Sequence, residues 1–172
     1  MRVFLAIDLP DSIKKDIEIQ ITPFKKEYPQ MTWVPQNNFQ ITTFSFGELN
    51  QIDNVKKIIE EAVYDIPSFA MFSLSADLFI TNRITLYLGF QRVKNIEHVV
   101  ERITESYKSS QSKQKFVPHL TLARYRVPSK QQYLLIKKKI QNLSINIEFT
   151  VSKLYLYDSN LNQLAEFSLL DE

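Results

Sequence analysis

Hydrophobic positions along the chain follow two spacings, one typical of strands and one typical of helices. Short apolar or alternating runs predict strands at residues 2–8, 39–46, 69–80, 83–90, 118–125, 147–157 and 163–170. Helical spacing predicts four helices, which begin near residues 11, 52, 93 and 129. Because strands alternate with helices, the pattern favours an α+β or α/β architecture over a β-sandwich.

Prolines and polar stretches set the expected ends of these elements. Pro23 is expected to kink or end the first helix near its last turn, and Pro67 closes the second. The polar stretch Ser109–Lys115 is expected to be an exposed loop. Thr81 and Asn82 are expected to form the turn between two neighbouring strands.

The two halves of the chain resemble each other. Gln40-Ile41-Thr42 and His119-Leu120-Thr121 are both polar-x-Thr elements on predicted strands, and each is followed by an amphipathic helix. The two elements are separated by close to half the chain. This pattern predicts a weak internal duplication, with two sheets that face each other across a groove.

Composition limits the class of protein. With 172 residues, 44% hydrophobic and 23% charged, the chain is expected to form a single bilobal domain over residues 1–172. Two glycines are too few for a Gly-rich phosphate loop, and the absence of cysteine excludes thiolate catalysis. The net charge of +2 does not by itself indicate a nucleic acid partner. Asp8 interrupts the first apolar run, so we expect a soluble cytoplasmic protein without a membrane segment.

The two histidines differ in their surroundings. His98 lies off the apolar stripe of its helix and is expected to be exposed. His119 lies on a strand, where alternation places it with Thr121 and Ala123 on the face opposite Leu120. An imidazole and a hydroxyl on one rigid strand can bind a phosphate oxygen and move a proton. A structural histidine with a hydrogen-bonded ring remains the alternative.

Other candidates each have a second interpretation. Strict alternation directs Arg124 away from His119, although a β-bulge could turn it inward, and Arg126 is a nearby substitute. Trp33 and Phe44 could stack on a base but are more simply core residues. The lysine run at residues 137–139 is expected to be a solvated helix face, with a nonspecific RNA contact as the other interpretation.

The residues around His119 resemble a known signature. Residues 118–124, Pro-His-Leu-Thr-Leu-Ala-Arg, are similar to the second motif of the two-histidine (2H) phosphoesterase superfamily. Within it they resemble the bacterial 2′-5′ RNA ligase group, also described as RNA 2′,3′-cyclic phosphodiesterases. The resemblance extends through three further landmarks in the same order, at residues 2–10, 33–48 and 151–159.

The resemblance implies an α+β fold of two pseudo-symmetric α/β lobes, whose antiparallel sheets flank a central groove. It implies chemistry without metal or cofactor on a 2′,3′-cyclic phosphate end of an RNA or nucleotide, by a protein expected to be monomeric. His119 is then the proton acceptor and Gln40 occupies the position of the proton donor. Thr42, Thr121 and Arg124 are then the substrate-binding residues.

The chain departs from the family at the first motif, where Gln40 replaces histidine and Phe44-Ser45 replaces the usual Lys-Phe pair. An amide donates hydrogen bonds but does not release a proton near neutrality. The leading hypothesis is therefore a phosphodiesterase that opens cyclic ends to 2′-phosphates, with activity reduced at Gln40. The alternatives are an inactive module that binds RNA ends or nucleotides, and a phosphoesterase for another cyclic or 2′-5′-linked substrate.

Overall fold

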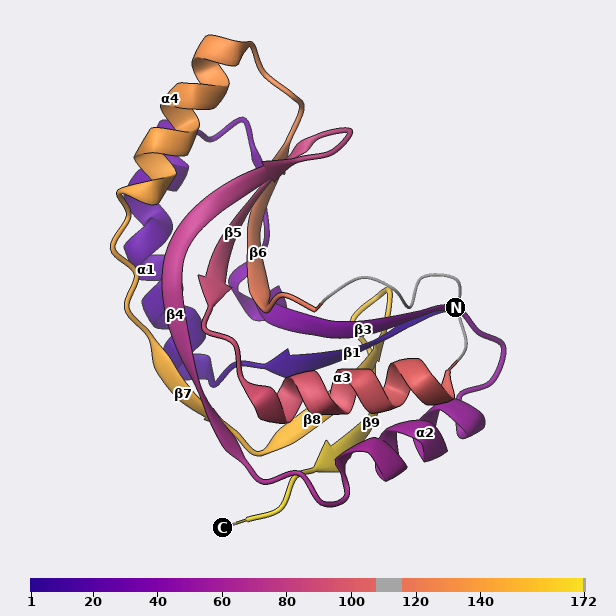
Figure 1. Ribbon diagram of the computed structural model, residues 1–172. Coiled ribbons are helices and arrows are strands. Elements are labelled where there is room, and N and C mark those ends of the chain that lie inside the picture. Colours follow the sequence, from indigo (N-terminus) through magenta and orange to yellow (C-terminus); the bar gives the residue numbers. More distant parts are fainter. Residues whose placement is uncertain (108–115, 172) are drawn as a thin grey trace.

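Two antiparallel β-sheets form the frame of the molecule (Figure 1). The computed structural model describes residues 1–107 and 116–171, so the predicted loop at Ser109–Lys115 lies outside the described residues. The four-stranded sheet consists of β3 (Gln40–Glu48), β1 (Arg2–Asp8), β8 (Lys153–Asp158) and β9 (Gln163–Ser168), in that spatial order. The five-stranded sheet consists of β2 (Thr32–Trp33), β6 (His119–Tyr125), β5 (Ile84–Phe90), β4 (Phe69–Ile80) and β7 (Glu148–Val151).

The described residues form four α-helices: α1 (Asp11–Glu27), α2 (Asp53–Val63), α3 (Lys94–Ser106) and α4 (Lys130–Gln141). Figure 1 shows α1 beside α4 on the side of β4, and an ion pair between Glu27 and Lys139 joins these two helices. Helices α2 and α3 pack together, and they contact β9 and β3 of the other sheet. The predicted α+β architecture of two lobes is therefore present.

Apolar residues at the predicted spacing form the core. The stripe of α3, from Ile96 to Ile103, is buried, and so are alternate residues of β5 from Ile84 to Phe90. One continuous cluster of buried side chains includes residues from both sheets. No helix in the described part of the chain is long and apolar enough to cross a membrane.

One expectation about element boundaries is wrong. Residues 147–157 form two strands rather than one, because the chain leaves the five-stranded sheet at Val151 and enters the four-stranded sheet at Lys153. Pro23, which was expected to kink or end the first helix near its last turn, lies inside α1, and the helix ends soon after it, at Glu27. Pro23 and Ile19 are both exposed, so water can bind the carbonyl that lacks its helical partner.

Candidate active site

A pocket of about 480 Å³ lies between the two sheets and brings together residues of both predicted half-sites. Gln40 and Thr42 reach it from β3, whereas Thr121 and Arg124 reach it from β6. All four side chains can donate hydrogen bonds, and no carboxylate is among the lining residues. Such a set of donors favours an anionic ligand. The remaining lining residues are Phe4, Thr32, Trp33, Val34, Pro35, Asn38, Ser159 and Leu161.

His119 is not among the lining residues, although it begins the same strand that carries Thr121. Its ring packs edge-on against two aromatic side chains, with centroids 5.7 Å from Tyr87 and 6.2 Å from Phe79. The groove expected between the two sheets therefore contains three polar side chains of the two polar-x-Thr elements, Gln40, Thr42 and Thr121. His119 lies two positions before Thr121 on β6, outside the lining.

The hydrogen bond of His119 determines which ring nitrogen is available. Nδ1 lies 2.9 Å from the backbone oxygen of Val117. A carbonyl oxygen only accepts hydrogen bonds, so in the neutral ring Nδ1 carries the proton and donates it to this contact. Nε2 is then the nitrogen with a free lone pair. A histidine in this form is suited to accept a proton.

Gln40 lies in a different environment. It pairs across the sheet with Asp8 at the end of β1. The Asp8 carboxylate accepts a hydrogen bond from the Leu9 N–H and lies 2.8 Å from the ammonium of Lys14, whose side chain is 8% exposed. Lys14 also donates to the backbone oxygen of Asn37, 3.3 Å away. An ion pair with a buried lysine and a partly exposed aspartate therefore supports the strand end that carries Gln40.

Each half-site contains a β-bulge directly after its threonine. In β3, Thr42 pairs with Ala6 and Phe44 with Leu5, which leaves Thr43 as the extra residue. In β6, Thr121 pairs with Tyr87 and Ala123 with Leu86, so the extra residue there is Leu122. The two halves share this backbone irregularity at equivalent positions, which supports the internal duplication expected from the sequence.

The bulge also corrects the expected direction of Arg124. Leu122 and Ala123 are both buried, so alternation restarts after them and Arg124 lines the pocket with Thr121. Strict alternation was wrong here because it omits the extra residue. Burial, and then the positive charge of Arg83, lower the pKa of Arg124 below the ordinary arginine value.

The other candidates have structural partners. His98 is exposed, and Phe44 is buried against Phe46 and Tyr107. Trp33 does line the pocket, but its ring nitrogen donates to the backbone oxygen of Tyr28. In the lysine run, Lys137 lies 3.5 Å from Asp77 and Lys139 is paired with Glu27, so two of the three lysines have carboxylate partners.

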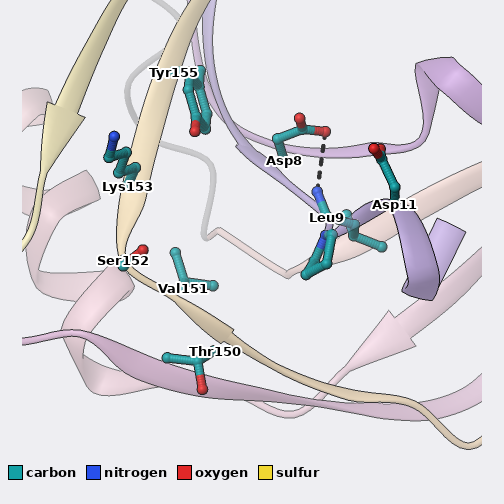
Figure 2. Close-up of a pocket in the computed structure, with 9 residues that line it drawn as sticks. Asp8, Leu9, Asp11, Thr150, Val151, Ser152, Lys153 and Tyr155 are labelled. Carbon is teal, nitrogen blue, oxygen red and sulfur yellow. Dashed lines mark hydrogen bonds between the residues drawn. The ribbon is translucent and has the colours of Figure 1, made fainter.

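A separate pocket of about 320 Å³ lies beyond Asp8, where the chain passes from one sheet to the other (Figure 2). Figure 2 shows the Asp8 carboxylate bonded to the backbone nitrogen of Leu9, with Tyr155 nearby on β8. None of the site residues predicted from the sequence lines this pocket. Over the described residues, no group of three or more His, Asp or Glu side chains is placed to hold a metal ion.

Sequence reasoning missed several neighbours of the predicted residues. Lys14 looked like an ordinary exposed position of the first helix, although it is buried against Asp8. Tyr87 belongs to the polar face of a predicted alternating strand, which was a usable signal. The pairing of that strand with β6, which places Tyr87 beside Thr121, was not visible in the sequence.

Comparisons with known proteins agree with this geometry. The family model described as the 2′-5′ RNA ligase superfamily matches residues 11–163. An RNA 2′,3′-cyclic phosphodiesterase of Thermotoga maritima is 27% identical over 94% of this chain and 88% of its own. An RNA 2′,3′-cyclic phosphodiesterase of Methanocaldococcus jannaschii is 26% identical over 94% of this chain and 92% of its own.

Solved structures show the same fold. E. coli LigT complexed with 3′-AMP superimposes with a TM-score of 0.74 at 22% identity, over 98% of this chain and 97% of that one. TT0787 of Thermus thermophilus also gives 0.74, at 18% identity over the full length of both chains. The fold of two sheets, each with one polar-x-Thr strand, agrees with the family match over most of the chain. The chain belongs to the 2′-5′ RNA ligase superfamily of 2H phosphoesterases.

Proposed function

We propose that this protein opens the 2′,3′-cyclic phosphate at RNA or nucleotide ends to a 2′-phosphate. The observation that carries the proposal is the hydrogen bond from His119 Nδ1 to the Val117 oxygen, which leaves Nε2 free to act as a base. Beside it lies a pocket lined by donors from both sheets and by no carboxylate. A general base next to an anion-binding pocket fits hydrolysis of a phosphodiester.

In the proposed reaction each residue has a separate role. His119 Nε2 accepts a proton from water as the water oxygen attacks phosphorus. The bond from phosphorus to the 3′ oxygen breaks, the 3′ oxygen receives a proton from solvent, and the phosphate remains on the 2′ oxygen. Thr42, Thr121 and Arg124 donate hydrogen bonds to the phosphate oxygens as negative charge increases on them.

Gln40 limits the rate in this scheme. Its amide stabilises an oxygen by a hydrogen bond but supplies no proton to the leaving group. Loss of a general acid typically lowers a rate by about 10²–10⁴-fold. We therefore propose slow turnover with substrate binding retained.

The names of the relatives support this choice of substrate. Both curated proteins are named RNA 2′,3′-cyclic phosphodiesterase, and each aligns along nearly all of this chain. LigT, whose fold is shared, has been crystallised with 3′-AMP, a nucleotide that carries its phosphate on the ribose. We propose that the protein acts in the cytoplasm, where RNA ends are available, and as a monomer.

The first test measures turnover of 2′,3′-cyclic AMP and identifies the product. We expect slow release of adenosine 2′-phosphate, and a further loss of about 10²–10⁴-fold in His119→Ala. His98→Ala is the matched control, because His98 is an exposed histidine on α3, and it should keep full activity. Equal rates for His119→Ala and the unmodified protein would overturn the assignment of His119 as the base.

The presence of Gln40 at the proton-donor position favours a second candidate function, an inactive module that binds RNA ends. The same experiment distinguishes this binding module from the cyclic phosphodiesterase. If 2′,3′-cyclic AMP binds but is not opened, and 2′-5′-linked dinucleotides are also untouched, the binding module replaces the enzyme. If only the linked dinucleotides are cleaved, the substrate of the phosphoesterase is different.

A further inference from the structure

A second basic pocket adjoins the candidate active site. Its volume is about 420 Å³, and it shares Thr32 and Arg124 with the pocket that contains Gln40. The other lining residues are Asn82, Arg83, Tyr125 and Arg126. A ligand in the first pocket could therefore extend into the second without crossing protein.

Three arginines meet here because of strand register. Ile84 and Tyr125 are the last residues paired between β5 and β6. Arg83 and Arg126 flank this pair on opposite strands, just beyond the sheet, so the two are neighbours. Arg124 pairs with Thr85 on one side and with Thr32 on the other. The bulge at Leu122 turns Arg124 to the same side of the sheet as Thr121.

Over the residues that the structure describes, these three arginines differ from the other arginines in having no acidic partner. Arg92 forms an ion pair with Glu97, and Arg102 forms one with Asp65. No ion pair joins Arg83, Arg124 or Arg126 to any carboxylate of residues 1–107 and 116–171.

The contacts that these arginines do make leave their charge uncompensated. Within the described part of the chain, the charged-group contacts of Arg126 are with the ring and hydroxyl of Tyr125, at 5.6 Å and 3.3 Å. Arg83 and Arg124 line the same pocket. Burial, and after it the positive charge of Arg83, lowers the pKa of Arg124, in keeping with repulsion between two neighbouring guanidinium groups. Like charges gathered without counter-charges destabilise the folded protein until an anion binds.

We propose that this arginine pocket binds the phosphodiester that precedes the cyclic end of an RNA chain. The inference rests on the proposed function and specifies its substrate, an oligoribonucleotide rather than a mononucleotide. Guanidinium groups suit this role because their planar donors match the oxygens of a phosphate. The cyclic phosphate occupies the first pocket, and the chain continues across Arg124 to Arg83 and Arg126.

The test compares three substrates: 2′,3′-cyclic AMP, the same nucleotide with a 5′-phosphate, and the dinucleotide ApA with a 2′,3′-cyclic end. We expect kcat/KM for the dinucleotide to exceed that for 2′,3′-cyclic AMP by on the order of 10-fold, through KM. The double variant Arg83→Gln/Arg126→Gln should lose this preference and keep its rate on 2′,3′-cyclic AMP. Arg92→Gln, which removes an exposed arginine at the other end of β5, is the matched control and should keep the preference.

Salt gives a second readout. The KM of the dinucleotide should rise more steeply with ionic strength than that of 2′,3′-cyclic AMP, by about 0.7 in the logarithmic slope for one bound phosphate. The double variant should remove this difference. A preference that survives in the double variant, or equal use of the first and third substrates by the unmodified protein, would overturn the proposal. Equal preference for the 5′-phosphorylated nucleotide would overturn the assignment to an RNA chain, because a phosphate monoester would then suffice.

Binding separates this proposal from the proposed function. Dissociation constants of the three ligands are measured in His119→Ala, where turnover is suppressed, with the arginine substitutions added in the same background. If the unmodified protein opens none of the substrates, the proposed reaction fails, whereas a dinucleotide preference that depends on Arg83 and Arg126 would still support the arginine pocket. Equal dissociation constants for all three ligands would overturn the proposal that the arginine pocket binds RNA. Circular dichroism checks that each variant is folded.

Discussion

The two half-sites have the same backbone conformation but differ in the side chains that surround them. Each presents a polar residue and a threonine from a strand that bulges directly after the threonine. His119 lies against the rings of Tyr87 and Phe79, whereas Gln40 lies across from Asp8, which is paired with Lys14. The duplicated backbone therefore fixes where two side chains are placed, and the neighbouring strands decide what each one can do.

The residues after the bulges extend the contrast. Arg124 follows the bulge of β6 and lines the pocket, whereas the equivalent position in β3 is the exposed Ser45. The half-site of His119 thus combines the proposed base with an arginine that lines the pocket, whereas Gln40 and Thr42, the lining residues of β3, are uncharged. We therefore propose that β6 carries most of the chemistry, and the following substitutions test this asymmetry.

The largest change is expected from Gln40→His, which restores a proton donor to the weaker half-site. An imidazole and a glutamine side chain have similar reach, so we expect kcat to rise by up to about 100-fold, at the lower end of the general-acid range. The added imidazole donates only while protonated, so it should also add a descending limb to the pH–rate profile at higher pH. Steady-state rates on 2′,3′-cyclic AMP at several pH values measure both effects.

Gln40→Asn is the matched control for this gain, since it changes length without adding an ionisable group. It should not increase the rate. An unchanged rate in a folded Gln40→His protein that still binds ligand would show that a missing acid does not limit turnover.

Removal of the two threonine hydroxyls compares the half-sites directly. Thr121→Val should lower kcat/KM by on the order of 10-fold, because a hydrogen bond to a charged oxygen is lost. Thr42→Val should lower kcat/KM by the same factor or a smaller one, since the half-site of Thr42 lacks the nearby arginine. Thr150→Val, an exposed strand threonine outside the pocket, serves as control. A larger loss in Thr42→Val than in Thr121→Val would reverse the asymmetry.

Much of this comparison could be anticipated from the sequence, because it depends on local patterns. The alternation along β5 and the stripe of α3 predict buried faces, and both are observed. The polar-x-Thr elements are visible as short motifs. The family resemblance rests on such local features and needed no knowledge of strand pairing.

The missing parts depend on register and on contacts between distant residues. The bulge at Leu122 reverses the direction of Arg124, and an extra residue in a strand leaves no mark in an alternating pattern. The burial of Lys14 arises because α1 packs near Asn37, twenty-three positions away in the chain. The break at Ser152 separates strands of two different sheets, although one apolar run extends across it in the sequence.

A smaller effect is expected from Lys14→Met, which leaves the Asp8 carboxylate without its cation. The free energy of unfolding should fall by about 1–3 kcal/mol, less than for a fully buried pair because Asp8 is partly exposed. The rate should change only a few-fold, since Lys14 supports the strand end without lining the pocket. Urea unfolding and steady-state kinetics provide the two values. The double variant Asp8→Asn/Lys14→Met should recover part of the lost stability, and a lower stability than either single variant would contradict the pairing.

The smallest effect on activity is expected from Tyr87→Phe, on the side of His119. Burial, and then the charge of Asp77, raise the pKa of the Tyr87 hydroxyl above its ordinary value of about 10. The hydroxyl therefore stays neutral in the range where the enzyme would be assayed, and Tyr87→Phe should leave the pH–rate profile unchanged below pH ~10.

The raised pKa of Tyr87 also affects stability. Because folding favours the protonated form of the hydroxyl, the stabilising contribution of this group is complete below the unfolded-state pKa and is lost as pH rises through the folded-state pKa. The unmodified protein should thus lose more stability than Tyr87→Phe between pH ~9 and pH ~11, as measured by thermal unfolding. If Tyr87→Phe instead removed a limb of the pH–rate profile near neutrality, the tyrosine would take part in the proton transfer, and His119 would not act alone on its side of the groove.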